Sequence, residues 1–239
     1  MGAGETLRVA LTAIAANRLR SALTVLGVVI GVMSVVLLVA VGSGARDEVT
    51  AGVQDLGSNL LLVVPGSLEF GQAPTVSKFT LDDVEDLQRA LEGRADVSGT
   101  LTSGESVRGE GTTAFASVLG VTARFDEVLN RATARGDFLT ESDVAVGRRV
   151  AVLGASAADA LFPGSDPIGR SVTIGGLRFR VVGVAERLGA TLGVDRDAQV
   201  YVPLTAAQRL FGTRRVDTIF IEAGDPEALA PLTDEVERL

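Results

Sequence analysis

The side chains that could carry out chemistry are few, and their types exclude most reactions. The sequence has no histidine and no cysteine, which excludes imidazole bases, thiolate nucleophiles, disulfides and Cys/His metal sites. The only lysine, Lys78, belongs to no Ser-x-x-Lys pattern. Asp82 and Asp83 stand where charges at a helix start are expected, which is a better interpretation than a general acid or base. The stretch GASAA at 154–158 is similar to a nucleophile elbow, but without a histidine partner it is better interpreted as a helix start.

Sites for ions, nucleotides and nucleic acids are not indicated either. The acidic residues lack the spacing of an EF-hand loop, and the chain has no G-x-x-x-x-G-K-[ST] motif for ATP. The isoelectric point of about 4.7 argues against a nucleic-acid surface. We therefore expect a protein that is not an enzyme and needs no cofactor or metal ion. If ATP is used, a separate ATPase chain must supply it.

The strongest feature of the sequence is an uncharged apolar run from Leu23 to Val41. Its 19 residues would reach about 28 Å as a helix, close to the hydrocarbon thickness of a bilayer. The run has no polar stripe of the kind that a surface helix shows. It predicts a transmembrane helix at 23–43. A cleaved signal peptide is the alternative, with Ala40–Gly42 as a poor cleavage site, but its apolar part is usually only about 7 to 15 residues long.

The charges around this run predict its orientation. Residues 1–22 carry a net charge of +2, with Arg18 and Arg20 at the membrane edge, and residues 46–239 carry −10. By the positive-inside rule the N-terminus is cytoplasmic, and the chain after about Gly44 lies outside the plasma membrane. We expect 1–22 to form an amphipathic juxtamembrane helix on the inner membrane face. The alternative is an ordinary beginning of the transmembrane helix itself.

Two glycines within the apolar run could pack against a neighbouring membrane helix. Gly27 and Gly31 are four residues apart, a spacing that lets two helices approach closely. The alternative is that glycine is simply common in membrane helices. A packing role for Gly27 and Gly31 would indicate a homodimer or a paired permease chain.

The segment after the run alternates between strand and helix patterns. A helix continues out of the membrane over 44–55, a buried strand follows at 60–64, and a capping box of Thr80 with Asp83 begins a helix that ends at Gly93. Further strands are predicted within 97–125, with breaks at Gly104, Gly109 and Gly111, and at 149–153, 198–204 and 217–223. Short helices are predicted at 155–162, 205–211 and after the Asp225–Pro226 cap, and a hairpin turns at Gly175–Gly176.

This order predicts an α+β extracytoplasmic domain over 44–239, built in two parts. The first part is a porter-like βαβ layer formed by 44–93 and 217–239, which are separated in sequence. The second part, 94–216, is an inserted smaller mixed subdomain that is rich in strands.

Several stretches together resemble the MacB-like permeases of ABC transporters, which are relatives of FtsX and of lipoprotein-release permeases. The resemblance covers about 17–224 and rests on these stretches in order: NRLRSALTVLGVVIGVMSVV, GSGARDEV, LGSNLLLVVPG, RGDFLTESDV, RVAVLGASAADALFPGSDPIGRSVTIGGLRFRVVGV and VYVPLTAAQRLFG. It implies one N-terminal span, an outer domain with a porter-like part and an inserted part, and three further spans, which this chain lacks. It also implies a dimer that works with a cytoplasmic ATPase and transmits ATP-driven motion to the outer domain.

Two functions are therefore considered. The first is a permease subunit of a MacB-type transporter, which couples a separate ABC ATPase to export or mechanotransmission. The alternative is a membrane-anchored, FtsX-like module that binds and regulates an extracytoplasmic partner protein without transport. Substrate efflux that needs this chain and an ATPase would favour the first, and loss of a partner's activity with intact efflux would favour the second.

Overall fold

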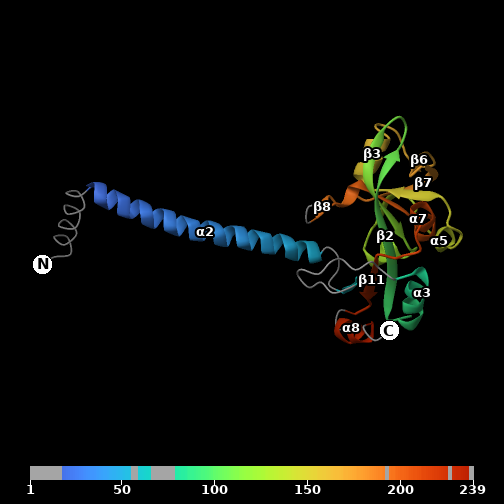
Figure 1. Ribbon diagram of the computed structural model, residues 1–239, viewed down its shortest axis with the longest axis horizontal. Coiled ribbons are helices and arrows are strands. Elements are labelled where there is room, and N and C mark those ends of the chain that lie inside the picture. The colour runs from blue at the N-terminus through green and yellow to red at the C-terminus, as the bar shows by residue number, and fades with distance from the viewer. Residues whose placement is uncertain (1–17, 55–58, 66–78, 192–193, 226–227, 237–239) are drawn as a thin grey trace. The chain divides into compact units, whose positions relative to one another are not determined.

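The computed structural model describes residues 18–54, 59–65, 79–191, 194–225 and 228–236 (Figure 1). The chain divides into two compact units, Met1–Ala51 and Gly52–Leu239, which are described separately. Most of the predicted juxtamembrane helix at 1–22 lies outside the described residues.

All described residues of the N-terminal unit lie in one continuous helix, α2 (Arg18–Gln54). This confirms that the helix continues beyond the apolar run, as far as Gln54. Its described side chains between Leu19 and Ala40 are all exposed within the chain. Within the described part of the chain, no helix combines the length and the apolar character needed to cross a membrane. The transmembrane helix at 23–43 thus stays a prediction.

The second unit is built on one sheet of nine strands in the order β1-β11-β2-β3-β10-β5-β7-β4, with β6 paired to both β2 and β7. These strands are β1 (Leu60–Val63), β2 (Ala95–Arg108), β3 (Thr113–Val121), β4 (Thr133–Gly136), β5 (Val150–Leu153), β6 (Ser171–Ile174), β7 (Leu177–Ala185), β10 (Gln199–Pro203) and β11 (Thr218–Ala223). A separate small hairpin pairs β8 (Ala190–Thr191) with β9 (Val194–Asp195).

The pairings of β6 close six of these strands into a ring. The ring runs β2-β3-β10-β5-β7-β6 and returns to β2, so each of its strands has a hydrogen-bonded neighbour on both sides. Side chains that alternate along the ring strands, such as Val107, Val118, Phe179 and Val200, are fully buried in one continuous core. A second core on the other side of the sheet contains Tyr201 and its aromatic neighbours. The ring therefore has a filled interior and few open strand edges.

Short helices cover the sheet and fill the ends of the ring. They are α3 (Leu81–Ala90), α4 (Phe125–Val128), α5 (Glu141–Val146), α6 (Ala155–Leu161), α7 (Leu204–Phe211) and α8 (Leu229–Val236), with a 3₁₀ turn η1 (Arg196–Ala198). α3 packs on β2, α7 on β2 and β3, and α8 on β1. In Figure 1, α3 and α8 lie at one end of this unit and β6 and β7 at the other.

The helix cap and the hairpin turn that the sequence predicts are both confirmed. Thr80 and Asp83 form the predicted capping box, because the Thr80 side chain accepts from the Asp83 N–H and the Asp83 carboxylate accepts from the Thr80 N–H. Gly175 and Gly176 turn the β6–β7 hairpin at φ values of 53° and 83°, the left-handed backbone that such a two-residue turn requires. The Pro226 part of the last predicted cap lies outside the described residues.

The predicted break at Gly104 is wrong. β2 runs through it without interruption from Ala95 to Arg108. The glycine instead leaves space for a ring: a Cβ atom there would lie 2.6 Å from Cζ of Phe115 on β3. The break between β2 and β3 occurs only at 109–112, where Gly111 has a φ of 78°.

One strand belongs to both parts of the predicted two-part division. The first residues of β2, Ala95–Thr100, pair with β11, and its last two residues pair with β6. The division at residue 94 stays a prediction, but the two parts share β2 rather than meeting at a linker.

Candidate functional site

The predicted site residues Arg18, Arg20, Gly27 and Gly31 all lie on one helix, α2. Arg18 begins α2 and Arg20 follows one residue further on. A Cβ atom built on Gly27 or Gly31 would meet no other atom of this chain within 4 Å. Both glycines thus leave room for an outside neighbour, and their packing role stays a prediction.

The candidate residues for chemistry do not come together in the fold. Asp83 is occupied in the capping box of α3. Gly154 is the N-cap of α6, which confirms that GASAA is a helix start. Lys78 lies outside the described residues. Among the residues that the structure describes, no three His, Cys, Asp or Glu side chains are close enough to bind a metal ion.

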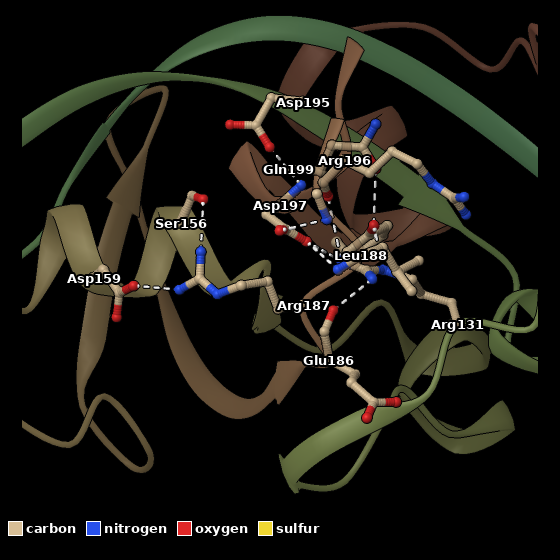
Figure 2. A network of polar contacts seen from close by, with 12 residues as sticks. Arg131, Ser156, Asp159, Glu186, Arg187, Leu188, Asp195, Arg196, Asp197 and Gln199 are labelled. Atoms are coloured by element: carbon tan, nitrogen blue, oxygen red, sulfur yellow. Dashed lines mark hydrogen bonds and ion pairs between the residues drawn. The ribbon is translucent and has the colours of Figure 1, made fainter. Parts of the chain in front are cut away.

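The most strongly organised polar site is a buried clamp around Arg131, whose side chain is only 1 % exposed. Its Nε donates to Tyr201 Oη at 3.0 Å, its Nη1 to the Glu186 carbonyl at 2.6 Å, and its Nη2 to the Arg196 carbonyl at 3.2 Å. Glu186 and Arg196 stand at the two ends of the segment 186–197, which we call the strap. A single guanidinium group therefore holds both ends of the strap (Figure 2).

Asp197 completes the clamp from within the strap. Its carboxylate lies 3.5 Å from Arg131 Nη2 and accepts the N–H groups of Leu188 at 2.9 Å and Gly189 at 2.8 Å. Burial opposes ionisation of Asp197, but these two N–H groups and the charges of Arg131 and Arg187 outweigh it and lower its pKa. The charged pair is therefore the stable form, as a buried ion pair with satisfied hydrogen bonds should be.

Tyr201, on β10, connects the clamp to the second core. Its hydroxyl donates to Gln199 Oε1 at 2.8 Å, and its ring lies 5.5 Å from Phe125 and 5.8 Å from Phe138, measured between centroids. Burial raises the pKa of the hydroxyl, and the Arg131 charge opposes that shift.

A second attachment holds the strap from outside. Arg187 pairs with Asp159 of α6 at 2.6 Å and reaches Ser156 at 3.4 Å (Figure 2). Both charged side chains are mostly exposed, so this pair adds little stability beside the buried one. The clamp contains no nucleophile with an adjacent base. Its arrangement fixes the position of the strap and performs no chemistry of its own.

A groove of ≈ 630 Å³ lies between α3 and α5. Apolar side chains that include Leu81, Val84 and Val144 line it, and Arg89 and Arg124 stand among its polar residues. No buried polar group converges on it, so the groove provides shape and apolar contact rather than a reactive centre.

Sequence reasoning missed the whole clamp. Arg131, Asp197 and Tyr201 belong to no motif, and 70 residues separate the first from the last. Only their low exposure in the folded chain distinguishes Arg131 and Asp197 from the many other charged residues. The one feature of the sequence that could have drawn attention to the clamp is that Tyr201 is the only tyrosine.

Comparison with known proteins shows where the fold belongs. The family model of the MacB-like periplasmic core domain matches residues 21–239. The chain is 36% identical over 240 residues to the macrolide export ATP-binding/permease protein MacB of Azoarcus sp.. It is 36% identical over 242 residues to the pyoverdine export ATP-binding/permease protein PvdT of Pseudomonas putida. Each match covers 98% of this chain and 36% of the relative, so the chain spans about a third of their length.

Solved structures show the same fold. The periplasmic region of MacB from Actinobacillus actinomycetemcomitans superposes with a TM-score of 0.66 at 22% identity, over 78% of this chain and 86% of that one. The extracellular domain of the ABC-type transporter YknZ from Gram-positive bacteria gives 0.60 at 21% identity, over 73% and 88%. The mixed α/β character of the predicted α+β domain is thus confirmed, and its division into two parts stays a prediction. This chain belongs to the family of the MacB-like periplasmic core domain.

Proposed function

We propose that this chain is the anchored extracytoplasmic part of a MacB-type ABC transporter permease. ATP hydrolysis by a separate cytoplasmic ATPase moves the outer domain and drives export or mechanotransmission. The observation that carries the proposal is the family match over 21–239, together with relatives whose names combine ATP binding with a permease. The 239 residues contain no G-x-x-x-x-G-K-[ST] motif for ATP, and the separate ATPase is part of the proposal.

The unbroken helix α2 supports this mechanism. The apolar run at 23–41 crosses the membrane in the proposal, and α2 continues for 13 residues beyond it, to Gln54. The helix contains no proline, although Gly42, Ser43 and Gly44 form a Gly/Ser pair of the kind at which helices can also bend. In the proposal, α2 is the segment of chain that connects the membrane part to the outer domain, so a displacement of the membrane part reaches the outer domain through it.

The outer domain has the stiffness that such a role requires. The closed ring of six strands leaves few edges that could peel apart, and the Arg131 clamp fixes a segment that would otherwise be a long loop. Motion delivered to this domain would move it as a body rather than deform it.

The chain is well suited to a topology test because it has no native cysteine. Single cysteines at Thr6→Cys and at the exposed Glu92→Cys are probed in intact cells with a membrane-impermeant maleimide. We expect Glu92→Cys to react in intact cells and Thr6→Cys only after lysis. The opposite pattern, or reaction of both in intact cells, would overturn the orientation.

Coupling to ATP needs a second measurement. With the partner ATPase present, the labelling rate of Glu92→Cys should change when ATP is added, and it should not change with an ATPase that binds but cannot hydrolyse ATP. The alternative, an anchored regulatory module, would be favoured by two results together. The labelling rate of Glu92→Cys would not change with ATP, and the activity of a partner protein in the envelope would still require this chain.

A further inference from the structure

The outer side of four neighbouring ring strands, β3, β2, β6 and β7, carries an unusual set of side chains. Val107, Val118, Val172 and Phe179 point into the filled interior of the ring and are fully buried. Because side chains alternate along a strand, their neighbours in sequence lie on the outer side. These include Arg108 on β2 and Arg178 and Arg180 on β7, all three exposed.

Strand register brings the three arginines together. Arg108 lies opposite Thr173 of β6, and Thr173 lies opposite Arg178 of β7. With neighbouring strands about 4.8 Å apart, the Cα atoms of Arg108 and Arg178 are roughly 10 Å apart. Arg180 follows two residues along β7, about 7 Å further on. We call this set, with Phe115 of β3, the arginine face.

The arginine face carries no compensating acid. Among the described residues, none makes an ion pair or hydrogen bond with the side chains of Arg108, Arg178 or Arg180. The one acidic residue on the outer side of these four strands is Asp96, which lies near the opposite end of β2 and pairs with Arg124. The nearby Glu105 lies on the opposite side of β2, and Glu110 pairs with Arg170. Three adjacent uncompensated arginines are notable in a chain with a net charge of −8.

Phe115 adds an aromatic surface to the same side. It lies opposite Ser106 of β2, and its side chain is the most exposed large apolar one in the described outer domain, at 79%. Its ring lies over Gly104, where a Cβ atom would approach Cζ to 2.6 Å. Exposed aromatic and arginine side chains without lysine or glutamate are the composition that distinguishes protein–protein interfaces from ordinary surface.

We propose that the arginine face binds a carboxylate-rich segment of a partner protein. The proposal rests on the proposed function for placing this face outside the cell membrane, and it names the chemistry of the extracytoplasmic partner. Guanidinium groups bind carboxylates through paired hydrogen bonds, and an extended segment places alternate carboxylates about 7 Å apart, the Cα spacing of Arg178 and Arg180. An anionic membrane is the weaker occupant, because a charge of −10 on residues 46–239 opposes a broad approach to it.

The test measures binding of a fluorescent peptide of alternating glutamate and serine to the full chain in an uncharged detergent. The same peptide with glutamine in place of glutamate is the control ligand. We expect binding of the glutamate peptide only, weakened by salt because exposed charges are screened. Arg178→Gln with Arg180→Gln should weaken binding about threefold to thirtyfold, the range for two exposed ion pairs.

A matched control variant tests whether peptide binding needs the arginine face or only the positive charge of the chain as a whole. Arg214→Gln with Arg215→Gln removes the same charge from two other exposed arginines, which lie between α7 and β11 and outside the arginine face. This variant should change the affinity by less than about twofold. Equal losses in both variants, or equal binding of the glutamine peptide, would overturn the proposal. Arginine-dependent binding to phosphatidylglycerol vesicles without peptide binding would replace the protein partner with a membrane.

Failure of this proposal is distinguishable from failure of the proposed function. If the peptide binds but Glu92→Cys reacts only after lysis, the arginine face does bind carboxylates, but the proposed orientation of the chain in the membrane is wrong. If Glu92→Cys reacts in intact cells and the peptide does not bind, the domain is outside but this face has another role.

Discussion

Replacing Asp197 by asparagine should destabilise the outer domain far more than the loss of one surface charge. Arg131 is 1% exposed and Asp197 2% exposed as side chains, so the change leaves a buried guanidinium without its counter-ion. Breaking one side of a buried pair in this way costs about 3–5 kcal/mol. The change also leaves one backbone N–H without its acceptor, because Leu188 and Gly189 donate to different carboxylate oxygens and asparagine has only one oxygen.

This loss should be visible as a large shift in melting temperature. For a domain of this size about 1 kcal/mol corresponds to a shift of about 2–4 °C, so the expected decrease is roughly 6–20 °C. The assay is the fluorescence of Tyr201, which is the only tyrosine in a chain without tryptophan. Because the Tyr201 hydroxyl accepts from Arg131 Nε, the signal reports on the clamp itself.

The control is Asp159→Asn, which removes the exposed partner of Arg187 from the same region. An exposed pair contributes at most about 1 kcal/mol, so this variant should melt within a few degrees of the unchanged protein. If Asp197→Asn also costs less than about 1 kcal/mol, the two charges are not coupled as the structure shows, and the reasoning fails.

The pH dependence provides an independent check. The pKa of Asp197 is lowered in the folded chain, so its contribution to stability is fully present above the unfolded pKa of about 3.9 and is lost as the pH falls through the folded value. Asp197→Asn should remove this part of the acid sensitivity. An unchanged acid slope below about pH 4 would contradict the assignment.

Three further predictions concern packing, capping and assembly. Gly120→Val should cost about 1–3 kcal/mol by urea unfolding, because even a Cβ atom at Gly120 would lie 2.3 Å from Cβ of Ala207; a neutral result would mean that α7 can move away from β3. Thr140→Ala should cost about 1 kcal/mol, since the Thr140 hydroxyl caps α5; no loss of stability would show that the cap contributes nothing. Gly27→Leu with Gly31→Leu should lower the dimer yield in detergent if these glycines pack helices together, and an unchanged yield would contradict that role.

Local structure was predictable wherever a few neighbouring residues decide the backbone. The capping box at Thr80 needs only a residue three positions further on, and the turn at Gly175–Gly176 needs only two residues that tolerate positive φ. The stretch RGDFLTESDV contains a second capping box of the same kind, formed by Thr140 and Asp143. Such features involve no partner from elsewhere in the chain.

The site and the closure of the ring could not be predicted in this way. Gly104 was interpreted as a break from its residue type, yet the ring of Phe115 from the next strand makes it part of a continuous β2. The ring closes only because Val107 and Arg108 meet Ile174 and Thr173, more than 60 residues later.

The sequence by itself determined the apolar run, the helix cap at Thr80 and the hairpin, because each depends on residues close together along the chain, and several such stretches in order determined the family. Tertiary structure alone decided that Arg131 and Asp197 are a buried pair and that Arg108, Arg178 and Arg180 share one outer side. The physical reason is that burial and charge neighbours are properties of three-dimensional packing, and an isolated arginine in a sequence shows neither.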